Sequence, residues 1–101
     1  MAYVSVVEIT WAVDLESHET RAIARRVREE LVPDLRSQPG FISYQGIAAS
    51  EDPRTSVAVV TWDSQENAEA GLRRSEAWTR DVASRYIASR RVYSGEDLFS
   101  S

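Results

Sequence analysis

The sequence contains no cysteine and no lysine, and its single histidine is His18. The lack of cysteine excludes a disulfide framework, a thiolate nucleophile and a cysteine-ligated metal. One histidine is too few for the usual zinc or non-haem iron site, which takes two or more, so no metal site is expected. No spacing of serine and histidine suggests a Ser-His-Asp triad either. The residues left to carry chemistry are aromatic rings and arginines.

Long apolar runs and the marks of a leader peptide are also missing. No run approaches the roughly 20 apolar residues that cross a bilayer, so we expect no membrane span. The first residues show no basic stretch, apolar region or cleavage site, which predicts no secretory signal and, by default, a cytoplasmic location. The chain has only four glycines and three prolines, which argues against a disordered or collagen-like protein.

The chain is acidic overall, and every basic residue in it is an arginine. Twelve arginines stand against 16 acidic residues, for a net charge of −4. Residues 1–70 hold six arginines and twelve acids, whereas residues 71–101 hold six arginines and four acids. Nucleic-acid binders usually carry a strongly basic face, so no nucleic-acid partner is expected.

The first half of the chain predicts a strand, a helix and a second strand. Residues 3–13 are rich in β-branched and aromatic side chains, which is typical of a strand. Ser17 is a good helix N-cap, and apolar residues follow at helical spacing as far as Leu31. Pro33 predicts a break or kink in this helix. The turn signal at 38–40 leads into a strand over 41–49.

The second half predicts a hairpin, a helix in two pieces and a short last strand. Residues 51–54 form a tight connection to a strand over 57–62, which should pair with the strand before it as an antiparallel hairpin. Asp63, with Glu66 three residues later, fits a capping box for the next helix. Ser75 predicts the cap of a second helical piece. The last strand is expected over 91–93, followed by a tail over 94–101.

The order β-α-β-β-α-β is typical of the ferredoxin-like α+β fold, here as one domain over residues 1–101. In this fold helices cover one face of a four-stranded antiparallel sheet. The first strand carries apolar side chains on both of its sides, Tyr3 and Val7 on one and Val4 and Val6 on the other. An apolar face left without helices indicates a partner on that face.

Several short motifs in order resemble the antibiotic biosynthesis monooxygenase (ABM) superfamily. They are Pro39-Gly40-Phe41 at the start of the second strand, an acidic-proline hairpin, and Trp62-Asp63-Ser64 leading into an alanine-rich helix that reaches Ala70. The resemblance extends from about residue 4 to residue 93. It implies a homodimeric α/β barrel in which two sheets pack face to face. It also implies a cofactor-independent monooxygenase that oxidises an electron-rich polycyclic aromatic or polyketide substrate, such as an anthrone, with dioxygen.

The resemblance also implies site residues. Trp62 matches the family's tryptophan at the end of the third strand, and Arg80 is the better match to an arginine on the following helix, with Arg85 as the alternative. These imply Trp62 and Arg80 as catalytic residues. The expected substrate-binding residues are aromatic side chains and the second arginine, namely Trp11, Tyr44, Trp78, Arg85 and Tyr86. The family's asparagine four residues before the tryptophan is replaced by Ala58.

The aromatic residues and arginines also have a purely structural interpretation. The aromatic rings can simply fill the core and the dimer interface, and Arg80 and Arg85 can be surface residues paired with Glu76 or Asp81 at helical spacing. The protein would then be a non-catalytic dimeric barrel that binds a small aromatic ligand. A cyclase or isomerase acting on a similar ligand is a third alternative.

No cofactor is expected. The chain has no glycine-rich phosphate loop and no dinucleotide fingerprint. The resemblance supplies two positions at which this chain can be compared with the haem-degrading members of the superfamily. Val82 stands where they have the histidine that binds iron, and the first strand has no asparagine, since the one asparagine of the chain is Asn67.

Overall fold

Four antiparallel strands form one sheet in the order β2-β3-β1-β4. The computed structural model describes residues 2–99, and its strands are β1 (Tyr3–Trp11), β2 (Phe41–Ala48), β3 (Thr55–Trp62) and β4 (Ile87–Glu96). β1 pairs with both β3 and β4, and β2 pairs with β3, as the predicted hairpin requires. Gly40 precedes β2 with a φ of 78°, a left-handed conformation that favours glycine at this turn. The expected ferredoxin-like α+β fold is confirmed.

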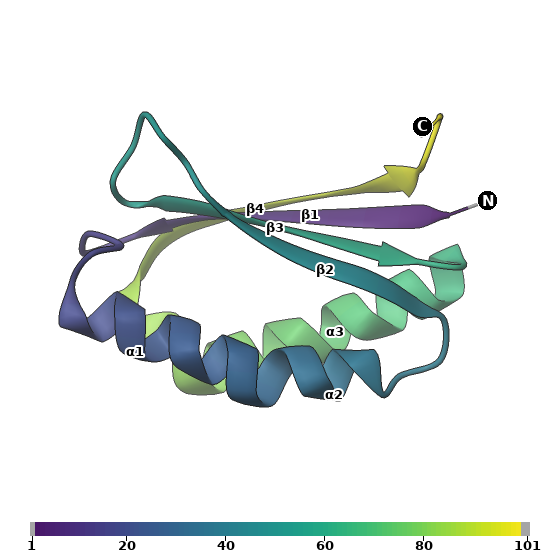
Figure 1. Ribbon diagram of the computed structural model, residues 1–101, viewed down its shortest axis with the longest axis horizontal. Coiled ribbons are helices and arrows are strands. Elements are labelled where there is room, and N and C mark those ends of the chain that lie inside the picture. The colour runs from purple at the N-terminus through teal and green to yellow at the C-terminus, as the bar shows by residue number, and fades with distance from the viewer. Residues whose placement is uncertain (1, 100–101) are drawn as a thin grey trace.

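Helices cover one side of the sheet and leave the other bare (Figure 1). They are α1 (His18–Arg26), α2 (Val32–Arg36) and α3 (Gln65–Val82). A single-turn 3-10 helix over Ser84–Tyr86 joins α3 to β4. Ser17 caps α1 as predicted, because its side chain accepts a hydrogen bond from the backbone N–H of Thr20. Within residues 2–99, no helix combines the length and the apolar character needed to cross a membrane.

The predicted break at Pro33 is a widened turn rather than an interruption. A π-helical stretch, Val27–Leu31, joins α1 directly to α2, and the backbone N–H of Val32 bonds to the carbonyl of Val27. Pro33 follows immediately, in the first turn of α2. A proline ring crowds the carbonyl of the preceding turn and supplies no N–H donor. The wider π turn lies directly before Pro33, where the regular helical hydrogen bond is lost.

The start of α3 corrects the predicted cap. Ser64 is the N-cap, and its side chain accepts a hydrogen bond from the backbone N–H of Asn67 at 3.2 Å. Asp63 lies one residue too early for this role. Its carboxylate instead accepts a hydrogen bond from the side-chain amide of Asn67 at 2.8 Å. Serine and aspartate are both good caps, so local preference alone could not choose between the two positions.

The prediction of two helical pieces is wrong, and so is that of a short last strand. α3 runs unbroken from Gln65 to Val82, and the Ser75 hydroxyl bonds back to the carbonyl of Leu72 within the helix. β4 spans ten residues, so the first residues of the predicted tail belong to the sheet. Ser94 and Glu96 lie opposite Ser5 and Tyr3 of β1. The tail residues 100–101 lie outside the described residues.

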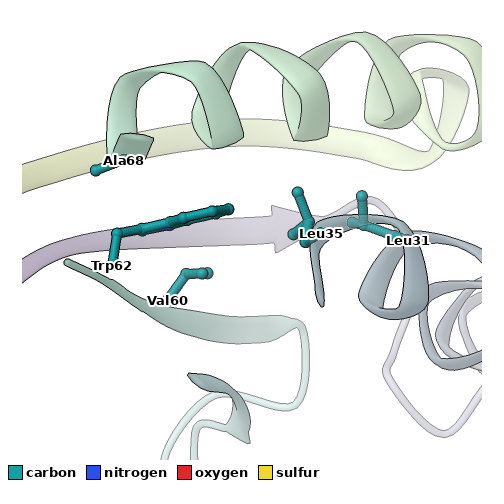
Figure 2. Close-up of a cluster of buried hydrophobic side chains, with 5 residues drawn as sticks. All are labelled: Leu31, Leu35, Val60, Trp62 and Ala68. Atoms are coloured by element: carbon teal, nitrogen blue, oxygen red, sulfur yellow. The ribbon is translucent and has the colours of Figure 1, made fainter. Parts of the chain in front are cut away.

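Two clusters of buried side chains hold the helices on the sheet. The first contains Leu31, Leu35, Val60, Trp62 and Ala68, and the second contains Trp11, Ile23 and Ala83. Figure 2 shows the first cluster, with the Trp62 side chain extending from β3 toward Leu35. Val60 and Trp62 therefore lie on the helix-facing side of the sheet. Residues that alternate with them along β3 lie on the bare side.

The bare side of the sheet has an apolar centre, as the two-sided pattern of the first strand predicts. Val59, Val6 and Tyr93 lie side by side on three neighbouring strands. Val57 lies beside Ile47 of β2 and Glu8 of β1, and Glu8 lies opposite Arg91 of β4. Ile47 remains 44% exposed and Tyr93 50% exposed. Within residues 2–99 no helix or strand covers this face (Figure 1).

Candidate functional site

Trp62 lies at the end of β3, beneath α3, and only 1% of it is exposed. The ring of Phe41 meets its indole edge-on, with 5.6 Å between ring centroids. On the other side the indole lies against Gly71 of α3, where a Cβ atom would fall 2.1 Å from Trp62 Cζ2. The glycine in the middle of α3, a weak helix former, thus makes room for the tryptophan.

A narrow slit lies between the sheet and α3 beside Trp62. Its walls include Ser5, Leu35, Leu72 and Ser75, and its volume is about 10 Å³. That volume is at the lower limit for one water molecule, for which about 10–15 Å³ is needed. The side chains around Trp62 are therefore closely packed and leave no room there for an aromatic ligand.

Two of the expected binding residues, Tyr44 and Trp78, pack against the cluster that contains Trp62. Burial raises the pKa of the Tyr44 hydroxyl above its ordinary value, so this group stays protonated at neutral pH. The indole Nε1–H of Trp78 donates a hydrogen bond to Glu30 at 3.3 Å. Hydrogen bonds from Arg26 and then Trp78 lower the pKa of the Glu30 carboxyl.

Trp11 and Tyr86 belong to the second cluster, apart from Trp62. Trp11 is buried with Ile23 and Ala83, and its indole Nε1–H donates a hydrogen bond to the Ser56 hydroxyl at 3.0 Å. Tyr86 packs against the same cluster, and so does Ile87, the first residue of β4. The fold therefore divides the expected aromatic residues between two separate groups.

An open hollow of about 260 Å³ lies between the C-terminal part of α3 and the first residues of β4. It is lined by Glu76, Thr79 and Arg80 from α3, together with Ser84, Ile87 and Arg90. The slit and the hollow follow one another along α3, since Ser75 lines the first and Glu76 the second. Arg80 is therefore placed beside an open space, whereas Trp62 is placed beside a closed one.

Arg85 is not among the residues that line the hollow. Its guanidinium carbon lies 5.6 Å from the centre of the Tyr86 ring, a cation–π arrangement with its own neighbour. Of the two arginines that the sequence left open, Arg80 is the one that faces a space for a ligand. Arg80 also lies 3.9 Å from Asp81, a loose contact between two exposed side chains.

Glu76 and Arg90 are residues of the hollow that sequence reasoning did not select. Nη2 of Arg90 donates to Glu76 Oε1 at 3.3 Å, which ties β4 to α3 across the hollow. Helical spacing could have found Glu76, because Glu76, Thr79 and Arg80 lie at i, i+3 and i+4 on one helix face. Arg90 was missed because the last strand was predicted to begin one residue after it.

Within the described part of the chain, no three His, Asp or Glu side chains come together in a way that could hold a metal ion. The arrangement available for chemistry is thus one of guanidinium, hydroxyl, carboxylate and aromatic groups.

Comparison by sequence gives no match: no protein-family model and no curated protein matches the chain. Comparison by structure gives many matches. A Nitrosomonas europaea protein assigned as an antibiotic biosynthesis monooxygenase aligns over 97% of this chain and 91% of its own, with 19% identity and a TM-score of 0.77. SnoaB from Streptomyces nogalater, a cofactor-independent oxygenase solved as a mutant, aligns over 98% and 95%, with 14% identity and a TM-score of 0.71.

The chain has the fold of the antibiotic biosynthesis monooxygenases. A second Nitrosomonas europaea protein, of unknown function, shares this ABM fold over 99% of this chain and 92% of its own, with 14% identity and a TM-score of 0.77. Identities this low establish the fold alone, and one fold supports many activities. In this chain the ABM fold carries Ala58 on β3, four residues before Trp62, and Val82 at the end of α3.

Proposed function

We propose that the protein is a homodimeric, cofactor-independent monooxygenase that oxidises an electron-rich aromatic substrate with dioxygen. The observation that carries the proposal is Trp62, a buried indole at the end of β3 in an ABM fold, at the position where the sequence resembles that superfamily. Arg80 supports it, because it lines the hollow that follows along α3 from Trp62. A cytoplasmic location belongs to the same proposal.

The substrate supplies the electrons in this mechanism. An anthrone-like methylene loses a proton to give an enolate, and the enolate passes one electron to dioxygen. The resulting carbon radical and superoxide recombine into a C–O bond, and protonation gives a hydroperoxide. Loss of water from the hydroperoxide leaves a carbonyl. One dioxygen is consumed for each quinone and water formed, so no other oxidant or reductant is needed.

The protein's part in this reaction is electrostatic and steric. The Arg80 guanidinium stabilises the enolate oxygen by donating hydrogen bonds, which favours loss of the substrate proton to water. Ile87 gives the hollow an apolar wall against which a ring packs. Trp62 fixes α3 on the sheet and so fixes the position of Arg80, which lies further along the same helix.

The bare face of the sheet supports the homodimer. Val6, Val59 and Tyr93 form a continuous row across three strands of that face. An exposed apolar patch of this kind marks an interaction surface in soluble proteins. A second copy would cover this row with its own row, because a two-fold interface uses the same patch of both subunits.

Oxygen uptake tests the activity directly. The purified protein, with no added metal, flavin or nicotinamide, is expected to speed oxygen consumption by anthrones or naphthohydroquinones, read against a protein-free blank and a denatured sample. A rate equal to that of the blank across the whole panel contradicts the proposal.

A non-catalytic barrel that binds a small aromatic ligand is the second candidate. It is favoured by Ala58, which has no side-chain donor for an oxyanion. This candidate predicts saturable binding of an anthrone-like ligand with no gain in oxygen uptake over the blank. A cyclase or isomerase would instead convert the ligand without consuming oxygen.

A further inference from the structure

The hollow between α3 and β4 has more positive than negative groups among its lining residues, although the whole chain is acidic. Among its lining residues are two arginines, Arg80 and Arg90, and one carboxylate, Glu76. The whole chain has a net charge of −4. A concave surface with an excess of one sign of charge concentrates ligands of the opposite sign. The hollow therefore favours an anion over a neutral molecule or a cation.

The described protein residues use little of the hydrogen-bonding capacity of the two arginines. Within residues 2–99, the Arg90 guanidinium makes one side-chain hydrogen bond, to Glu76, and 27% of the Arg90 side chain is exposed. The Arg80 guanidinium lies 3.9 Å from Asp81, which is too long for a hydrogen bond, and 73% of its side chain is exposed. Each guanidinium has five N–H donors in a planar fork that matches a carboxylate.

The remaining walls suit an aromatic ring. Ile87 lines the hollow and packs from the other side against the cluster that contains Trp11, so it is held in place. Thr79 and Ser84 add hydroxyl groups at the rim. The volume of about 260 Å³ is close to the lower end of the range for small-molecule pockets, about 300 Å³. It suits a ligand of one or two rings.

We propose that this hollow binds a small aromatic anion, with its carboxylate or phenolate oxygen between the guanidinium groups of Arg80 and Arg90 and its ring against Ile87. The inference deepens the proposed function by stating the charge of the substrate, and it rests on that function only for the aromatic nature of the ligand. A substrate bound as its phenolate, which is its enolate, also explains how the hollow works without a strong base.

Glu76 has a definite place in this arrangement. Its carboxylate accepts a hydrogen bond from Arg90, so it occupies a donor that an anionic ligand would use. It also repels the ligand, because both carry negative charge. Removing the charge of Glu76 should therefore strengthen anion binding, whereas removing the charge of either arginine should weaken it. If Glu76 and Arg90 formed an ion pair that only held the fold together, removing either charge would change ligand binding in the same direction.

The test is a titration of the full chain with 2-naphthoate, with 2-naphthalenemethanol as the uncharged ligand of the same ring system. Amide NMR shifts of Thr79, Ser84 and Ile87 report binding in the hollow. Arg80→Gln and Arg90→Gln are each expected to weaken naphthoate binding by about tenfold, the loss of one charge-assisted hydrogen bond. Glu76→Gln is expected to strengthen it. Arg73→Gln, an exposed arginine of α3 outside the hollow, is the matched control.

Three results would overturn the inference: equal affinity for the acid and the alcohol, arginine variants that bind like Arg73→Gln, or a Glu76→Gln variant weakened as much as Arg90→Gln. Arg80→Gln keeps the test valid if Arg90→Gln proves unstable, because Arg80 is exposed and makes only a loose protein contact. Naphthoate binding without oxygen uptake from any anthrone supports this inference and contradicts the proposed function. Oxygen uptake without naphthoate binding does the reverse.

Discussion

The indole of Trp62 and the backbone of Gly71 are in such close contact that a Cβ atom at position 71 would lie 2.1 Å from Trp62 Cζ2. No ordinary contact between carbon atoms is that short. The two residues lie on different elements, β3 and α3, so their contact sets how closely the helix approaches the sheet. It also closes the slit beside Trp62, whereas the hollow further along α3 stays open.

Gly71→Ala is expected to destabilise the protein. Alanine is the better helix former by about 1 kcal/mol, but overpacking against a buried ring costs about 1–3 kcal/mol, so the net loss should reach about 2 kcal/mol. Urea denaturation measures it. Gly46→Ala is the control, because a Cβ there meets nothing within 4 Å, and its free energy of unfolding should change little. A Gly71→Ala protein as stable as the wild type would contradict the close contact.

A double mutant tests whether the penalty at position 71 comes from the indole itself. Phenylalanine lacks the part of the indole nearest to Gly71, so Trp62→Phe should reduce the cost of Gly71→Ala. The coupling between the two changes should be about 0.5–3 kcal/mol, as for residues in contact. Equal penalties in both backgrounds would place the strain elsewhere in α3.

Trp62→Ala should cost about 3–5 kcal/mol of stability, as expected for a large buried aromatic side chain. Thermal or urea unfolding measures this loss. If Trp62 also acts in the site, Trp62→Phe, which keeps most of the volume, should lower oxygen uptake by more than its loss of stability explains. Uptake that simply follows the folded fraction would assign Trp62 a packing role alone.

Arg80→Ala is expected to lower the rate of anthrone oxidation by roughly 10²–10³-fold, the effect typical of removing one oxyanion donor. The oxygen electrode measures this, with the spontaneous rate subtracted. Arg73→Ala makes the same charge change on an exposed part of α3 and should retain the wild-type rate. Arg85→Ala should have a smaller effect than Arg80→Ala, because Arg85 does not line the hollow. The opposite order would identify Arg85 as the functional arginine.

Sedimentation should give the wild-type chain twice its 11.4 kDa mass at micromolar concentration. Val6 lies in the middle of the apolar row on the bare face, so Val6→Lys should produce a monomer by placing a charge in the proposed interface. Ala70→Lys introduces the same charge at an exposed position of α3 and should leave the dimer intact. A monomeric wild type would remove the homodimer from the proposal.

Acid should weaken the link between α2 and α3. A hydrogen bond from Arg74 lowers the pKa of the Asp34 carboxyl below its ordinary value. Burial opposes this shift, and the positive charge of Arg74 adds to it. A carboxyl whose pKa is lowered by folding stabilises the fold above its unfolded pKa, and this contribution is lost as the pH falls through the folded value. Wild-type stability should thus fall more steeply below about pH 4 than that of Arg74→Gln. Parallel pH profiles would contradict this, with Arg73→Gln as the control. The difference should be small, because both side chains are partly exposed.

The order of elements could be predicted because each depends on a local pattern. β-branched residues over 3–13, the cap at Ser17 and the turn before Phe41 each specify structure within a few residues. The errors arose where two local signals were equally good. Asp63 and Ser64 are both capping residues, and Ser75 could either begin a helix or lie inside one, bonding back to the carbonyl of Leu72.

The sequence by itself determined the fold class, the apolar bare face of the sheet and the candidacy of Trp62 and Arg80. Only the tertiary structure decided which of these residues face an open space. Packing against Gly71 closed the site beside Trp62, and the pairing of β1 with a ten-residue β4 brought Arg90 across from Glu76. Both depend on contacts between different elements, Trp62 of β3 with Gly71 of α3 and Arg90 of β4 with Glu76 of α3. Local preference carries no information about such contacts, because they exist only once the sheet and helices have packed together.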